Sequence, residues 1–563
     1  MPPGAQTRLR SGGRRQTSGP GEPQWLNGAA LYQICPLSFR DGDGDGMGDL
    51  RGVLAGLDHV AALGVDAVWL SPFYTSPLAD FGYDVADHRA VDPRLGDLSL
   101  FDRVLDKAHR LGLKVLIDLV LGHTSDRHPW FEASRRSRAD DHADWYVWAD
   151  PSPDGTPPNN WLSVFGGPAW TWEPRRRQYY LHHFLARQPT LNHRSEACLE
   201  AMLDIARFWL QRGVDGFRVD AVDFLMRDPG LRPNPPVDAA PYEFPTKLFG
   251  MQVHVHDMMH EDVRFVLERL RAVTDAFPDR VLLGELSSQR GAAGRIEEYT
   301  REPAAGPGGL HAAYTLELPK KPFSPQVFRQ ALMAADDRGH TCWSFSNHDV
   351  ERAASRWRPA GADPARFEAL LAVLLSTLPG TICVYQGDEL GLPQAELAPE
   401  DVRDPFGLAF WPEFKGRDGS RTPLPWTPEA PNGGFCPSAV RPWLPVSPPH
   451  LARAVAVQER RNASTLAIWR AALQLRRTRG ALRDGRLTHV DEDGPVLAFG
   501  REDGAERIVC AFNFGLEPAG YMLPHADLSP IDLPRPPGAP EPALDGPSLT
   551  LPPLGVFLGV RPA

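Results

Sequence analysis

Several short apolar runs of the chain end in an acid or a histidine. The runs LIDLVLGH, GFRVD, VLLGE and WSFSNHD end in His123, Asp220, Glu285 and the pair His348 and Asp349. A single acid after a strand is commonly a helix cap. In a barrel of parallel strands, however, the carboxyl ends meet at one mouth, where the chemistry of such barrels takes place. Acids at several of these ends therefore predict a catalytic site there.

Two of these runs carry a pair of carboxylates suited to glycosidic chemistry. The twofold period of a strand places Arg218 and Asp220 on one face, next to the small Gly216. A nearby guanidinium favours an ionised carboxylate, as a nucleophile needs. Glu285 has no neighbouring cation in the sequence, so desolvation should raise its pKa and suit a general acid. Retaining glycosidases hold such a pair about 5–5.5 Å apart. The alternative for Arg218 and Asp220 is a structural ion pair.

The glycine-rich segment DGDGDGMGD, residues 41–49, concentrates four carboxylates. Asp41, Asp43, Asp45 and Asp49 would repel one another unless a cation binds between them. Gly52 stands where an EF-hand loop needs a bidentate glutamate, so the segment is not an EF-hand. An aspartate-rich turn without metal is the alternative, and we favour a metal site.

Apolar runs alternate with amphipathic segments along most of the chain, as strands and helices do. The predicted strands include residues 29–35, 65–70, 113–120, 214–219, 281–286, 342–345 and 381–385, and the predicted helices include residues 50–63, 100–111, 197–211, 263–276, 328–335, 367–378 and 466–477. About eight strand–helix pairs without a glycine-rich phosphate turn fit an α/β fold of the (β/α)8 TIM-barrel type better than an open sheet.

The alternation is interrupted in two places, which predicts the domain organisation. The basic, Gly/Pro/Ser-rich residues 1–24 predict a flexible tail, and residues 25–120 and 195–484 the catalytic barrel. Residues 121–194 are too long and too irregular for a loop and predict an inserted domain after the third strand. From residue 485 to 563 the pattern changes to period two, which predicts a C-terminal antiparallel β domain.

Charge and composition exclude several classes of protein. The chain has 60 Lys and Arg against 71 Asp and Glu, a net charge of −11 over 563 residues. We therefore expect no nucleic-acid or membrane partner, since both need a concentrated positive field. No run of about 18 apolar residues and no signal-peptide core occur. The six cysteines form no C-x-x-C pair, so we expect free thiols and a cytoplasmic location.

With these residues in view, the chain resembles glycoside hydrolase family 13, the α-amylase family, over about residues 25–563. The motifs DLVLGH, QPTLN, GFRVDAVDF, GEL and FSNHD occur in the family's order. The segments NNWLSVFGGPAWTW, QYYLHHF and FWPEFKGRDGSRTP are typical of bacterial α-glucosidases and α-glucosyl-transferring enzymes. Two positions depart from the family's pattern: Gly122 precedes His123 instead of Asn, and Thr190 replaces the Asp of QPDLN.

The resemblance implies a role for each site residue. It makes Asp220 the nucleophile, Glu285 the acid/base and Asp349 the stabiliser of the transition state. The implied sugar-binding residues are Tyr83, Asp84, His123, Phe165, Phe184, Arg218, Ala221, His348 and Arg417, with Arg421 as the alternative to Arg417. It also implies a structural Ca2+, or Mg2+, held by Asp41, Asp43, Asp45, the Met47 carbonyl and Asp49, and no organic cofactor.

We therefore expect a retaining α-glucosidase, monomeric or homodimeric, acting on short maltose-like oligosaccharides. Ala221 follows the nucleophile, where resembling oligo-1,6-glucosidases carry Val, so we expect mainly α-1,4 cleavage, with α-glucosyl transfer to alcohols as a second outcome. The alternatives are a trehalose synthase, a sucrose-type isomerase and an endo-acting amylase. A non-enzymatic transporter heavy chain is not favoured, because it would carry a membrane span and would lack some of the residues Asp220, Glu285 and Asp349.

Overall fold

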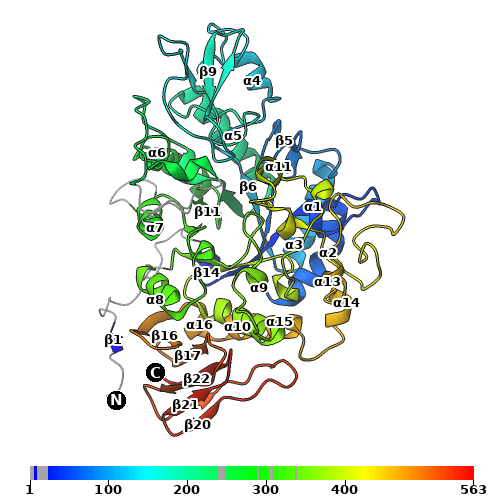
Figure 1. The fold of residues 1–563 in the computed structure, drawn as a ribbon, viewed down its shortest axis with the longest axis vertical. Helices are drawn as coiled ribbons and strands as arrows, with labels where there is room; N and C mark the ends of the chain where they lie inside the picture. Colours follow the sequence, from blue (N-terminus) through cyan, green and yellow to red (C-terminus); the bar gives the residue numbers. More distant parts are fainter. Residues whose placement is uncertain (1–5, 9–22, 239–246, 288–290, 303–307, 336–338) are drawn as a thin grey trace.

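Eight parallel strands form the centre of the computed structural model, which describes residues 6–8, 23–238, 247–287, 291–302, 308–335 and 339–563 (Figure 1). In spatial order the strands are β12 (Ala312–Thr315), β11 (Val281–Leu286), β10 (Gly216–Val219), β6 (Lys114–Leu119), β3 (Ala67–Leu70), β2 (Ala30–Ile34), β14 (Thr381–Tyr385) and β13 (Cys342–Ser344). A parallel bridge from Ala313 to Thr341 joins the two outer strands. The sheet therefore closes, and the predicted (β/α)8 barrel is confirmed.

Helices follow the strands along the chain. They are α2 (Leu50–Leu63), α3 (Leu98–Arg110), α5 (Glu196–Arg212), α6 (Val263–Asp275), α7 (Ala292–Tyr299), α8 (Pro325–Ala334), α10 (Pro364–Thr377) and α15 (Thr465–Thr478). Side-chain caps mark where several begin: Asp49 accepts from Gly52 N at 2.6 Å, and Asp97 from Leu100 N at 2.7 Å. The sequence pattern did not predict β12, because its AAYT run is too short and small to show periodicity.

Strand alternation in β10 points the chemistry inward. Phe217 and Val219 belong to the main core, while Arg218 contacts groups from neighbouring strands inside the barrel. Below this level, an inner layer fills the barrel with Leu116, Leu283 and other apolar side chains. Because this layer is packed, only the mouth of the barrel leaves room for a ligand.

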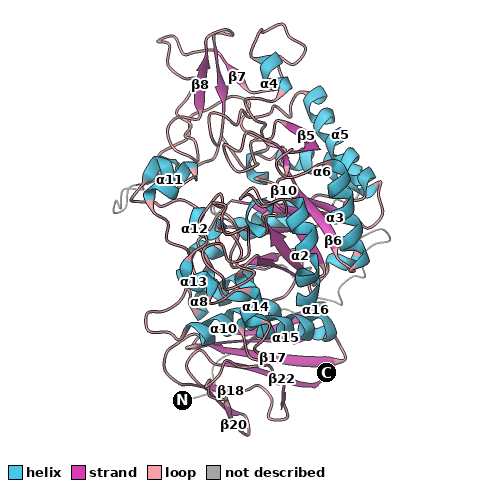
Figure 2. Cartoon of the chain, turned by 90° about the vertical axis from the view of Figure 1, so that its right-hand side faces the viewer, coloured by secondary structure: helices cyan, strands magenta, loops and turns pink. Residues whose placement is uncertain are grey.

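Two further regions are added to the barrel. Between β6 and α5 lies helix α4 (Pro129–Ser134) with a three-stranded sheet of β7 (Trp148–Ala149), β9 (Gln178–Leu181) and β8 (Trp170–Glu173), at the top of Figure 1. At the other end, β15 (Arg486–Asp491), β16 (Val496–Glu502), β17 (Glu506–Asn513), β22 (Val556–Pro562) and β19 (Ser529–Pro530) form an antiparallel sheet, and β18 (Ala519–Met522), β21 (Ser548–Leu551) and β20 (Ala543–Asp545) form a second one. Both sheets lie below helices α10, α15 and α16 (Gly480–Arg483) (Figure 2).

The beginning of the chain differs from the predicted flexible tail. Strand β1 (Gln6–Arg8) pairs antiparallel with β15, with Gln6 opposite Asp491. The free edge of β15 explains this pairing, because an unpaired edge strand presents a row of hydrogen-bonding groups. Residues 1–5 and 9–22 of the predicted tail lie outside the described residues.

Short elements complete the described chain. They are β4 (Tyr74–Thr75), β5 (Asp87–Val91), α1 (Pro36–Phe39), α9 (Ala353–Arg356), α11 (Pro405–Phe410), α12 (Asp418–Arg421), α13 (Pro448–Leu451), α14 (Val455–Gln458), and the 3-10 turns η1 (Gln24–Leu26), η2 (Val222–Phe224), η3 (Leu248–Met251), η4 (Leu318–Lys320), η5 (Asp388–Leu390) and η6 (Pro399–Asp401). Among the described residues, no helix is both long and apolar enough to cross a membrane.

Gly216 yields a prediction about the strand that carries the nucleophile. A Cβ there would lie 2.2 Å from the Val281 carbonyl oxygen of β11. Gly216→Ala should therefore push β10 away from β11 and lower the free energy of unfolding by about 1–3 kcal/mol, as measured by urea denaturation. Gly294→Ala is the control, because a Cβ at Gly294 meets nothing within 4 Å. Equal stability of both variants would contradict the close approach.

Candidate active site

A cavity of about 830 Å³ opens at the carboxyl ends of the barrel strands. Most of the predicted site residues line it: Tyr83, His123, Phe165, Phe184, Asp220, Ala221, Glu285, Asp349 and Arg417. They come from different strand ends, from the inserted region and from the segment after β14. A volume of this size suits a small ligand.

The Arg218 guanidinium joins the two predicted catalytic carboxylates. Arg218 is fully buried; its Nη1 lies 2.7 Å from Asp220 Oδ1, and its Nη2 lies 2.6 Å from Glu285 Oε2. The Ala221 backbone N–H also donates to Glu285 Oε2 at 3.2 Å. Two carboxylates on the two terminal nitrogens of one guanidinium must be close neighbours. Glu285 therefore has a cationic neighbour that the sequence did not reveal.

Burial raises the pKa of both carboxyl groups. The pKa of Asp220 rises to about 7, because burial and the charges of Asp118 and Asp349 outweigh the lowering effect of Arg218. The sequence predicted the opposite, a lowered pKa for Asp220, because only the effect of the neighbouring Arg218 could be seen in it. The pKa of Glu285 rises to about 8, through burial and the charges of Asp220 and Asp349 against the effect of Arg218. The pair therefore holds on to its last proton near neutral pH, as an acid catalyst beside a nucleophile requires.

Asp349 has the opposite electrostatic setting. Burial alone would raise its pKa, but His348, Arg417 and Arg421 hold it well below the usual range of an aspartate. Arg417 Nη1 and Arg421 Nη2 lie 2.8 and 3.0 Å from Asp349 Oδ1. Asp404 in turn binds Arg417 through its Nε, Nη2 and backbone N–H. Asp349 thus stays ionised, and both arginines offered by the sequence contact it.

Tyr83, His123 and His348 lie beside Asp349, and of these Tyr83 and His123 line the cavity. The Tyr83 ring stacks on the His348 ring, with centroids 5.3 Å apart and an interplanar angle of 4°. His123 Nε2 lies 3.1 Å from the Tyr83 carbonyl oxygen. Burial lowers the pKa of His123 to about 4 and that of His348 to about 3. Both imidazoles are therefore neutral hydrogen-bonding groups at neutral pH.

The structure corrects one predicted sugar contact. Asp84 is fully buried and does not line the cavity; its carboxylate accepts from Ser76 Oγ and from the backbone N–H groups of Ala79 and Asp80. Asp80 lines the cavity in its place, 2.7 Å from Arg417 Nη2. The tight turn ahead of Tyr83 explains the difference, because Asp84 is needed inside it as an acceptor.

Two other predicted sugar-binding residues lie behind the cavity wall. Arg218 and His348 are buried and do not line the cavity. Arg218 acts through Asp220 and Glu285, while His348 supports Tyr83 and lies 3.2 Å from Asp349 Oδ2. We therefore regard both as positioning residues.

Sequence reasoning missed Asp118, although a signal was present. Asp118 stands inside the apolar run of β6, where a carboxylate is unexpected unless it is paired. It is fully buried, binds Arg218 Nη1, and accepts from Trp69 Nε1 at 2.9 Å and Tyr83 OH at 3.2 Å. It links the guanidinium to the Tyr83 side of the cavity.

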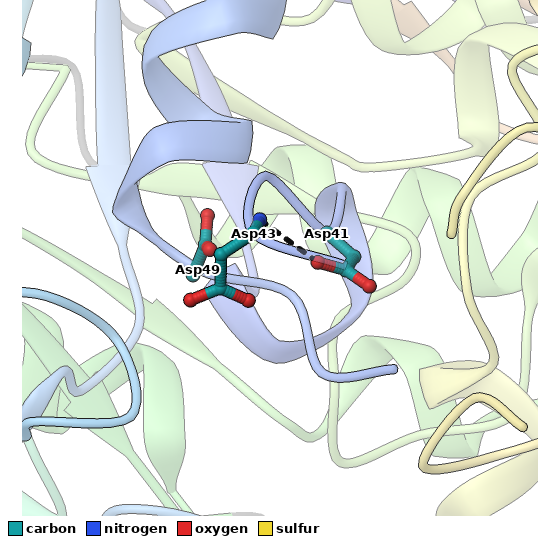
Figure 3. Close-up of side chains that lie close together, drawn as sticks. All are labelled: Asp41, Asp43 and Asp49. Atoms are coloured by element: carbon teal, nitrogen blue, oxygen red, sulfur yellow. Dashed lines mark hydrogen bonds between the residues drawn. The ribbon is translucent and has the colours of Figure 1, made fainter. Parts of the chain in front are cut away.

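The aspartate-rich loop brings three of its carboxylates together ahead of helix α2 (Figure 3). Ligand oxygens of Asp41, Asp43 and Asp49 lie within 4.8 Å of one another. Asp49 Oδ1 caps α2, while its Oδ2 is buried without a hydrogen-bond partner and lies 4.0 Å from Arg51 Nη1. Such an orphaned carboxylate oxygen fits a hard cation. Asp45 stands outside this group; its Oδ1 accepts from Met47 N at 2.7 Å.

A closed parallel barrel whose mouth holds an acid with a raised pKa beside a second carboxylate defines a glycoside hydrolase of the two-carboxylate type. The family model for the catalytic domain of alpha amylase matches residues 33–485 of the sequence. The chain belongs to the alpha-amylase family, glycoside hydrolase family 13.

Relatives of known name cover nearly the whole chain. It is 49% identical over 520 residues to a probable alpha-glucosidase of Rhizobium meliloti, covering 90% of this chain and 92% of the relative. It is 33% identical to an oligo-1,6-glucosidase of Heyndrickxia coagulans, covering 89% and 94%. Among solved structures, the alpha-glucosyl transfer enzyme XgtA is 47% identical with a TM-score of 0.90, covering 95% of this chain and 99% of that one.

Asp80 and Asp84 should respond differently to substitution. Asp80→Asn should lower kcat/KM by about 10²-fold, since the cavity loses a carboxylate. It should nearly keep the melting temperature, because the amide oxygen can still accept from Gln188 and Arg417, and Asp349 and Asp404 still hold the guanidinium. Asp84→Ala should instead lower the melting temperature, because two backbone donors lose their acceptor. If Asp84→Ala melted like the wild type but lost turnover, the original assignment of Asp84 would be restored.

Proposed function

We propose that the protein is a retaining α-glucosidase that removes terminal glucose from short, mainly α-1,4-linked oligosaccharides. The observation that carries this proposal is the pair Asp220 and Glu285 on the two terminal nitrogens of Arg218. Such neighbours suit the separation of about 5–5.5 Å used by retaining enzymes, not the 6.5–9.5 Å of inverting ones, which leaves room for a water. The family and the relatives named alpha-glucosidase support the choice of substrate.

The mechanism is a double displacement. Asp220 attacks the anomeric carbon and forms a glycosyl ester, while Glu285 gives its proton to the departing glycosidic oxygen. Glu285, now ionised, then takes a proton from a water or an alcohol that attacks the same carbon, and Asp220 leaves as a carboxylate. The raised pKa of Glu285 suits it to both proton transfers.

Three further residues serve the sugar in this mechanism. Asp349, held ionised by Arg417 and Arg421, faces the cavity and accepts hydrogen bonds from sugar hydroxyls as positive charge develops at the anomeric carbon. The Asp80 carboxylate and the Arg417 guanidinium offer an acceptor and donors to further hydroxyls of the same ring.

The shape of the cavity favours this function over an endo-acting amylase. An endo-acting enzyme needs a long open groove, whereas this site is a pocket of about 830 Å³ walled by Phe165, Phe184 and Phe406. Trehalose synthases and sucrose isomerases share the first displacement and differ in which alcohol attacks the ester. Transfer to an acceptor alcohol is therefore a second outcome of the same site, supported by the alpha-glucosyl transfer enzyme among the similar structures.

The nucleophile is tested directly. Asp220→Asn should lose at least about 10³-fold in kcat on maltose, because an amide cannot form the glycosyl ester. Proton NMR of wild-type turnover should show α-glucose as the first product. Thermal melting of the variant serves as the folding control. Initial release of β-glucose would refute retention, and near-normal turnover of Asp220→Asn would refute the nucleophile.

We further propose a structural calcium ion in the loop of Asp41, Asp43 and Asp49, with Mg2+ as the alternative. These carboxylates, the orphaned Asp49 oxygen included, would supply hard oxygen ligands, and the Met47 carbonyl and Asp45 belong to the ligand set that the family resemblance implies. The ion would neutralise the loop ahead of α2.

Metal removal tests this site. A cation that binds only the folded state raises stability, so EDTA treatment should lower the melting temperature and added Ca2+ should restore it. Asp49→Asn should weaken the response to Ca2+, while the pH profile of turnover stays unchanged because the loop does not line the catalytic cavity. A melting temperature indifferent to both EDTA and Ca2+ would contradict the proposal.

We propose that Ala221 sets the linkage preference. Ala221 lines the cavity directly after the nucleophile and adopts a left-handed backbone with φ 44°. A β-branched residue here narrows the space for the leaving sugar, and such a change is worth about 10- to 200-fold. Wild-type kcat/KM should favour maltose over isomaltose, and Ala221→Val should shift this ratio towards isomaltose. The ratio does not depend on how much variant folds. A wild-type preference for isomaltose would refute this role of Ala221.

We also propose a cytoplasmic location. All six cysteines are free, and five of them are buried. Unpaired thiols are typical of proteins in reducing compartments.

A further inference from the structure

One aromatic ring at the cavity contacts both a second ring and a lysine ammonium. Phe406 of α11 stacks on Phe165, with centroids 4.1 Å apart and an interplanar angle of 13°. Lys247 Nζ lies 3.8 Å from the Phe406 centroid and 3.9 Å from the Phe414 centroid. The Phe406 ring therefore contacts a second ring and an ammonium at the same time. We call Phe165, Phe406 and Lys247 the ring sandwich.

The ring sandwich connects three segments that are far apart in the sequence. Phe165 belongs to the region inserted between β6 and α5, Lys247 to the segment after β10, and Phe406 to the segment after β14. All three residues line the catalytic cavity. The sandwich therefore ties three walls of this cavity together through non-covalent contacts.

The Lys247 ammonium is a buried charge that lies against two aromatic rings. Burial lowers the pKa of Lys247 to about 8, with the cations Lys320 and Arg417 adding to this effect and Asp404 and Asp349 opposing it. Within the described part of the chain, no carboxylate forms an ion pair with Lys247. An ammonium over two aromatic faces is attracted by their quadrupoles. The rings of Phe406 and Phe414 therefore form cation–π contacts with the Lys247 ammonium.

The ring sandwich lies next to the catalytic groups. The Arg417 guanidinium is 5.2 Å from the centroids of both Phe165 and Phe406, and its Nη1 binds Asp349. Asp349 and all three members of the ring sandwich line the same cavity, so the sandwich helps to shape the space beside Asp349. Weakening the contacts of the ring sandwich should enlarge the pocket without removing a catalytic group.

We propose that Lys247, through the cation–π contact that completes the ring sandwich, determines how long a saccharide the cavity admits. The proposal rests on the proposed α-glucosidase function and concerns its substrate size. With the sandwich intact, the three walls stay together and disaccharides are favoured. When the contact is lost, the segment after β14 moves more freely, and longer saccharides gain relative to maltose.

The test measures the ratio of kcat/KM for maltotetraose to that for maltose. Lys247→Met, which keeps the stem but removes the charge, should raise this ratio about threefold to tenfold, and Phe406→Leu should do the same. Lys247→Arg should retain the wild-type ratio, because a guanidinium also binds aromatic faces. Lys321→Met is the matched control; Lys321 pairs with Glu317 outside the cavity lining and should leave the ratio unchanged.

The double variant separates the contact from general loosening. If Lys247 acts through Phe406, adding Lys247→Met to Phe406→Leu should change the ratio no further. Additive effects, or an unchanged ratio in Lys247→Met with a wild-type melting temperature, would overturn the proposal. A wild-type protein that does not cleave maltose would instead overturn the proposed function itself, so the two failures are distinguishable.

Discussion

The site depends on one buried guanidinium. Arg218 is inaccessible to solvent and is shared by Asp118, Asp220 and Glu285. A buried cation is costly unless it is paired and hydrogen-bonded. Here it comes from β10 and its partners from β6, β10 and β11, so satisfying the charge also aligns three adjacent strands. The same contacts bring nucleophile and acid together, which joins the stability of the barrel mouth to its chemistry.

The charges around Arg218 divide into two groups with different tasks. Asp220 and Glu285 share one guanidinium and have raised pKa values, so the pair retains a proton. Asp349 contacts both Arg417 and Arg421, and its pKa is lowered. Environment alone thus gives similar carboxylates the different properties that the proposed acid, nucleophile and ionised acceptor need. Neutral histidines beside them add hydrogen bonds without a competing charge.

The walls of the cavity are assembled from segments that are not barrel strands. Phe165 comes from the inserted region, and Phe406 and Arg417 from the long segment after β14. Asp404 anchors Arg417 from within that segment, which explains how a chain with so little regular structure holds a guanidinium in place. In this family member, therefore, the strand ends supply the carboxylates that we propose as catalytic, and the irregular segments supply the shape of the pocket.

The sequence by itself determined the barrel, the strand ends and the carboxylates that line its mouth, because strand periodicity is local and short motifs such as GFRVD are read along the chain. It missed β12, whose AAYT run is too short to show a period. It also placed Asp84 at the cavity, where the structure has Asp80, since a turn decides which of two nearby aspartates faces the cavity. Only the tertiary structure decided the sign of the Asp220 pKa shift and the contact of Glu285 with Arg218, because burial and long-range charge depend on residues distant in the chain. The ring sandwich is the extreme case, since its three members come from segments that meet only in the folded protein.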